Sequence, residues 1–85
     1  MASERIEHLV TQAVQQAYDV WAAQHPSLAA VIDRIALTEQ AAQSLRTSAD
    51  YRKAVADFHR GLAEVDLLNR LLDLVAPIIA GLLQT

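Results

Sequence analysis

Apolar residues recur at spacings of three and four over the first 24 residues, a pattern typical of one helix face. This stripe consists of Ile6, Leu9, Val10, Ala13, Val14, Ala17, Val20 and Trp21. The opposite face carries polar residues such as Gln12, Gln16 and Asp19. We therefore expect a first amphipathic helix over residues 3–24.

The pair His25-Pro26 interrupts this pattern, because a proline disfavours helical geometry in the residue before it and is tolerated in a new first turn. A second apolar stripe follows, made of Leu28, Val31, Ile32, Ile35, Ala42 and Leu45. It predicts a second helix over residues 27–46. The short corner between the two helices predicts that they pack as antiparallel neighbours.

Capping residues at positions 47–50 predict the start of a third helix. From there two seam positions alternate for more than four heptads, one on Tyr51, Phe58, Val65, Leu72 and Ile79, the other on Val55, Leu62, Asn69, Ala76 and Leu83. The unbroken phase favours a single helix over residues 49–84, bent near Pro77, since Gly61 costs only about 1 kcal/mol relative to alanine. The alternative is a break near residues 61–66.

These elements predict an all-α fold in a single domain, residues 1–85. We expect a three-helix bundle formed by a helical hairpin and a long C-terminal helix. A four-helix bundle is the alternative.

The C-terminal third is apolar around most of the helix circumference. Between residues 65 and 83 the charged or amide side chains are limited to Asp66, Asn69, Arg70 and Asp73, which share one narrow stripe. Two neighbouring helices cover only part of such a surface, and each large side chain left exposed forgoes roughly 1.5–3 kcal/mol. We therefore expect a self-association or docking surface on Leu67, Leu68, Asn69, Leu71, Leu74, Val75, Ile78 and Leu82.

Two residues in these stripes allow two interpretations each. A buried Asn69 could pair with its symmetry mate and fix the register of a dimer, but a position on the water-facing stripe is the favoured interpretation. Trp21 is expected to anchor the core, with an exposed contact point for a partner as the alternative.

Composition narrows the function classes. The 85 residues are 53% hydrophobic and carry a formal net charge of −3, which argues against disorder and against nucleic-acid binding. The chain has no cysteine, so disulfides, thiolate metal sites and cysteine nucleophiles are excluded. His8, His25 and His59 show no metal-binding spacing, and no glycine-rich phosphate loop exists. We expect no catalytic, cofactor-binding or metal-binding residues, and hence not an enzyme.

The first residues do not combine a basic region with an apolar core, as a secretory signal does, so a cytoplasmic protein is expected. The longest uncharged run, residues 74–85, is shorter than the about 20 residues that span a bilayer.

The sequence thus favours a non-enzymatic interaction module or adaptor. It would act as a homo-oligomer, with a dimer favoured, or dock a helical partner. The first alternative is a protein that lies on a membrane surface, which the two Asp residues of the polar stripe disfavour. The second alternative is a small hydrophobic ligand held in the bundle.

Overall fold

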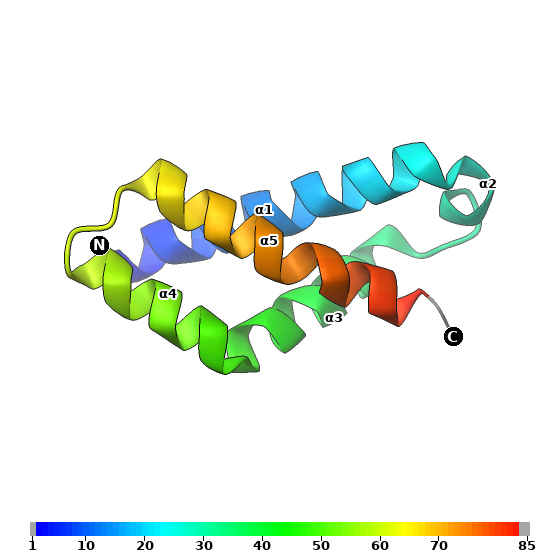
Figure 1. The fold of residues 1–85 in the computed structure, drawn as a ribbon. Coiled ribbons are helices and arrows are strands. Elements are labelled where there is room, and N and C mark those ends of the chain that lie inside the picture. The colour runs from blue at the N-terminus through cyan, green and yellow to red at the C-terminus, as the bar shows by residue number, and fades with distance from the viewer. Residues whose placement is uncertain (1, 84–85) are drawn as a thin grey trace.

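Five helices account for nearly all of residues 2–83, the part of the chain that the computed structural model describes (Figure 1). They are α1 (Ala2–Gln24), α2 (Pro26–Ala29), α3 (Arg34–Thr47), α4 (Ala49–His59) and α5 (Glu64–Leu82). The described residues form no strand, and the predicted all-α bundle is confirmed.

The long helices form a bundle in which the chain runs up, down and up again. α1 runs along the molecule, α3 and α4 return together, and α5 runs back in the direction of α1 (Figure 1). α3 and α4 meet at a bend at Ser48. α5 packs against α1, α3 and α4, so much of its apolar surface is covered by helices of its own chain.

The first helix is confirmed, and most of its predicted apolar stripe lies in the core. α1 contributes Ile6, Leu9, Val10, Ala13, Val14, Ala17 and Tyr18. The other helices contribute Leu37, Ala41, Leu45, Ala54, Leu67, Leu71, Val75 and Ile79. Val20 is the exception in the predicted stripe, because it is exposed.

The second helix predicted for residues 27–46 is wrong in its first third. The helical turn that begins at Pro26 ends at Ala29, and the chain starts a new helix after Asp33. The Asp33 side chain accepts hydrogen bonds from the backbone N–H groups of Ile35, at 3.1 Å, and Ala36, at 3.2 Å. An N-cap of this kind is worth about 1 kcal/mol, and it restarts the helix in a new direction.

The single third helix predicted for residues 49–84 is also wrong, and the alternative of two helices is confirmed. Gly61, with φ +118°, ends α4. The N–H of Gly61 donates to the carbonyl of Phe58, and the N–H of Leu62 donates to the carbonyl of Asp57, both at 3.0 Å. This pair of bonds is the Schellman arrangement, which favours glycine because an L side chain resists a positive φ.

Two predicted local features concern Ser48 and Pro77. The Ser48 hydroxyl accepts a hydrogen bond from the Tyr51 N–H at 3.1 Å and so caps α4, as the capping cluster predicts. α5 continues past Pro77 to Leu82.

Within residues 2–83 no helix combines the length and apolar character needed to cross a bilayer.

Candidate interaction surface

The predicted interface on the C-terminal helix is mostly core. Leu67, Leu71 and Val75 are 0% exposed in the single chain, so the prediction that they contact a partner is wrong. The remaining apolar members are partly buried against the core, namely Leu68, Leu74, Ile78 and Leu82. The physical reason is the turn at Gly61, which folds α4 back onto α5 as a third covering helix. Asn69 is exposed, as its favoured interpretation predicts.

Trp21 is half-buried against the core, which agrees with its favoured interpretation as an anchor. Its ring stacks on His25 with a centroid separation of 5.0 Å. The His25 Nδ1 atom also lies 3.2 Å from the carbonyl oxygen of Trp21. His25 thus closes the last turn of α1, where carbonyl groups lack helical partners.

Three exposed apolar side chains gather where α2 leads into α3. Leu28 is 50% exposed, Val31 is 81% exposed and Ile35 is 70% exposed. We call these three residues the apolar corner. They come from eight consecutive residues, and the break before Asp33 turns them away from the core. Three exposed large apolar side chains within one short segment are more informative than scattered exposed leucines, since exposed apolar surface often marks an interaction site.

α1 and α3 are joined by two ion pairs at opposite ends of their contact. Arg34 lies 3.0 Å from the Asp19 carboxylate, and Arg46 lies 2.7 Å from the Glu7 carboxylate. The two acidic residues are twelve residues apart on α1, and the two arginines are twelve residues apart on α3. Twelve residues span about 18 Å along a helix. The two pairs therefore belong to one antiparallel register between the helices.

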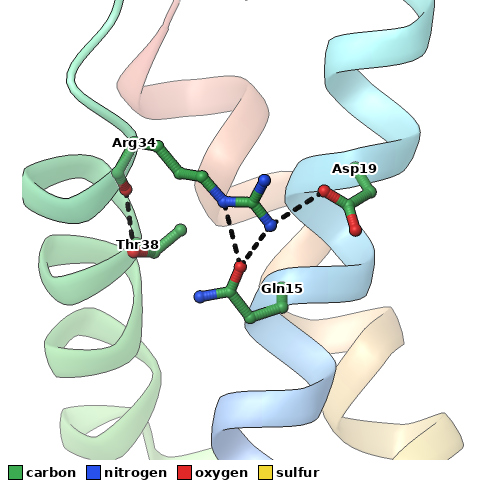
Figure 2. Close-up of polar contacts among 4 residues, drawn as sticks. All are labelled: Gln15, Asp19, Arg34 and Thr38. Carbon is green, nitrogen blue, oxygen red and sulfur yellow. Dashed lines mark hydrogen bonds and ion pairs between the residues drawn. The ribbon is translucent and has the colours of Figure 1, made fainter.

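Figure 2 shows how Arg34 is held between α1 and α3. Its Nε donates to the Gln15 side-chain oxygen at 3.1 Å, and its Nη2 donates to Asp19 at 3.0 Å. The guanidinium carbon also lies 5.0 Å from the centroid of the Tyr18 ring. Buried Thr38 donates its hydroxyl to the Arg34 carbonyl at 2.8 Å, so its polar atom is satisfied. Arg34 thus joins α3 to α1 through Nε and Nη2 and holds the two helices in register.

A groove of about 370 Å³ runs between the two helices. It is lined by Thr11, Val14, Gln15, Ile35, Thr38, Glu39, Ala42, Gln43 and Arg46. We call it the α1–α3 groove. Ile35 belongs both to this groove and to the apolar corner, so the two features meet at this residue. The apolar contribution comes from Val14, Ile35 and Ala42, and polar side chains form the remainder.

Charges around the groove are only partly paired. Arg46 pairs with Glu7, whereas Glu39 forms no ion pair with any residue in the range 2–83. Burial raises the pKa of the nearby Tyr51 hydroxyl, and the Glu7 carboxylate adds to the increase. On the other side of the molecule, the hydrogen bond from Arg70 holds the pKa of Asp57 below its ordinary value.

The described residues do not bring together three His, Asp or Glu side chains in a way that could hold a metal ion. His8, His25 and His59 are exposed and lie on different parts of the chain. The residue set around the groove is instead typical of a contact surface, with an apolar centre and a polar rim.

No protein-family model, no curated protein and no solved structure matches the chain.

Proposed function

We propose that the chain is a non-enzymatic helical interaction module that forms a homodimer through the apolar corner and the α1–α3 groove. The observation that carries the proposal is the position of Ile35, which is 70% exposed and lies in both features. A twofold dimer covers the same surface on both chains with a single interface. The proposal keeps self-association and moves it from α5 to a surface on α1, α2 and α3.

The energy of burial supports a dimer of modest affinity. Covering Leu28, Val31 and Ile35 is worth roughly 1.5–3 kcal/mol for each fully buried side chain. Association costs an estimated 4–15 kcal/mol in lost freedom, so most of this gain is consumed. We therefore expect a dissociation constant in the micromolar range or above, which corresponds to a binding free energy of about −8 kcal/mol or weaker.

The charges near the apolar corner favour a protein partner over a membrane. Binding to anionic lipid needs basic side chains beside the apolar residues. The charged residues within positions 28–35 are Asp33, which caps α3, and Arg34, which is bound to Asp19 and Gln15. Arg34 is the single basic residue within positions 28–35 and it pairs with Asp19, so this segment lacks the cluster of basic side chains that anionic lipid selects. A cytoplasmic location is also part of this proposal.

Sedimentation equilibrium tests the proposed surface with a matched pair of variants. Ile35→Asp places a charge in the contact surface, whereas Val65→Asp places the same charge at the equivalent second position of α5. Both side chains are exposed, and both helices tolerate an acid in the first turn, so neither change should unfold the chain. We expect Ile35→Asp to stay monomeric while Val65→Asp dimerises like the wild type. Equal dimerisation of the two variants would contradict the surface assignment.

A further inference from the structure

We propose that the two copies pack α3 antiparallel against α3, so that Glu39 of each chain pairs with Arg46 of the other. This inference rests on the proposed self-association and specifies its register. It assigns the α1–α3 groove of each chain to the α3 helix of a second copy.

The residues that line the groove from α3 share one face of that helix. This row consists of Ile35, Glu39, Ala42 and Arg46, which follow one another at spacings of four, three and four residues and all line the groove. Residues at these spacings stack along one side of a helix. A second helix that lies in the groove therefore meets this row of side chains.

The charges in this row are complementary to themselves in one orientation only. Glu39 and Arg46 lie at equal distances on either side of the midpoint between Ala42 and Gln43. A twofold axis through that midpoint, with the helices antiparallel, brings each Glu39 opposite Arg46 of the second copy. A parallel pair with the same residues in contact would bring Glu39 beside Glu39 and Arg46 beside Arg46, which is repulsive.

Both charged groups are available for this contact. Glu39 is exposed and has no ion-pair partner among residues 2–83. Arg46 binds Glu7 through Nε and Nη2, and its side chain is 39% exposed. A guanidinium has five N–H groups, so Arg46 can bind a second carboxylate through Nη1 while it keeps Glu7.

The centre of the proposed contact is small enough for close packing. Ala42 is half-buried and lies beside the proposed axis, which passes between it and Gln43 at the point where the two helices would approach most closely. A small side chain at that point permits an interaxial distance near the lower end of about 8–10 Å. Thr11 and Gln15 of α1 form the outer wall, which supplies the polar rim expected of a protein interface.

A charge-exchange experiment tests this register. Glu39→Arg and Arg46→Glu should each weaken the dimer at least about tenfold, because each places like charges opposite one another twice in the homodimer. Mixing the two variants in equal amounts restores both opposite-charge pairs, so the mixture should dimerise nearly as the wild type does. Asp73→Arg, on the exposed face of α5, serves as the control and should leave the dimer unchanged. Masses come from sedimentation equilibrium, with circular dichroism to confirm that each variant is folded.

An oxidative cross-link supplies a second measurement, which leaves Arg46 unchanged. The chain has no cysteine of its own, so an introduced cysteine can form a disulfide only with the same position of a second copy. Ala42→Cys should yield a disulfide-linked dimer on mild oxidation, since the proposed axis passes beside this position, whereas Asp73→Cys should not. A wild type that remains monomeric would overturn the proposed function and with it this register. A wild-type dimer that forms equally well from each charge variant alone, or in which Ala42→Cys fails to cross-link, would overturn the register while the self-association stands.

Discussion

Arg46 of α3 and Glu7 of α1 lie 2.7 Å apart, although 39 residues separate them in the chain. Together with the pair formed by Arg34 and Asp19, this contact sets one antiparallel register for α1 and α3. The α1–α3 groove lies between the two pairs, so the same contacts that align the helices also define the length of the groove. The surface that we propose for self-association therefore depends on the fold of the first half of the chain.

The energetic worth of this ion pair can be measured directly. Both side chains are substantially exposed, so water screens their attraction and the pair should contribute only about 0.2–1 kcal/mol to folding. A double-mutant cycle with Glu7→Gln and Arg46→Gln, followed by urea unfolding, measures this coupling. A coupling energy above about 2 kcal/mol would show that the pair is more shielded than the structure indicates.

The turn at Gly61 should resist substitution. Gly61→Ala forces a side chain into a backbone conformation with φ +118°, and we expect a loss of about 1–2 kcal/mol in the free energy of unfolding. Gly81→Ala is the matched control, because Gly81 lies inside α5 and a Cβ there meets nothing within 4 Å. That variant should be slightly more stable than the wild type, since alanine is the better helix former. Equal effects of the two substitutions would contradict the turn.

The role of α5 as core can be separated from a role as interface by protein concentration. Leu71→Ala removes a side chain that is 0% exposed, and we expect a loss of about 2–5 kcal/mol in unfolding free energy. The loss should be the same in dilute and concentrated samples, because the contacts lie within one chain. Leu28→Ala should change the stability of the monomer by less than about 0.5 kcal/mol. If the loss of unfolding free energy for Leu71→Ala disappears on dilution, Leu71 lies in an interface between copies and not in the core of one chain.

The ion pair between α4 and α5 gives stability a defined pH dependence. Arg70 lies 2.6 Å from Asp57 and lowers the pKa of that carboxyl group. A carboxyl group whose pKa is lower in the folded state stabilises the fold above its unfolded pKa, about 3.9, and loses this contribution as the pH falls through the folded value. Asp57→Asn should therefore melt at a lower temperature than the wild type at neutral pH. The difference should shrink once the pH falls well below about 3.9, and a difference that stays constant down to strong acid would contradict this assignment.

The sequence was sufficient for the helical class and the first helix, but the break before Asp33 was missed and the break at Gly61 was predicted only as the alternative. The heptad phase continues across Gly61, yet Val65, the seam residue that follows Leu62, is 63% exposed, so the seam residues do not share one face in space. A better signal was present, since His59 and Arg60 followed by Gly61 are typical of a helix end. Asp33 likewise marks a helix start within what looked like one stripe.

The interaction surface was missed for a different reason. The apolar excess of α5 correctly indicated a central helix, but a single sequence does not tell how many neighbours cover it. Once α4 folds back, the excess is satisfied within the chain, and Leu71 and Val75 become core. The only sequence signal for the groove was the matched twelve-residue spacing of Glu7 to Asp19 and Arg34 to Arg46, which gains meaning only when the helices are paired.

The central claim is that one chain covers α5 and leaves a different surface for a second copy. The most direct test is the mass of the wild-type particle by sedimentation equilibrium, from low micromolar to several hundred micromolar protein. We predict a mass that rises from the 9.3 kDa of one chain toward twice that value. A mass that stays at 9.3 kDa over the whole concentration range would contradict the account.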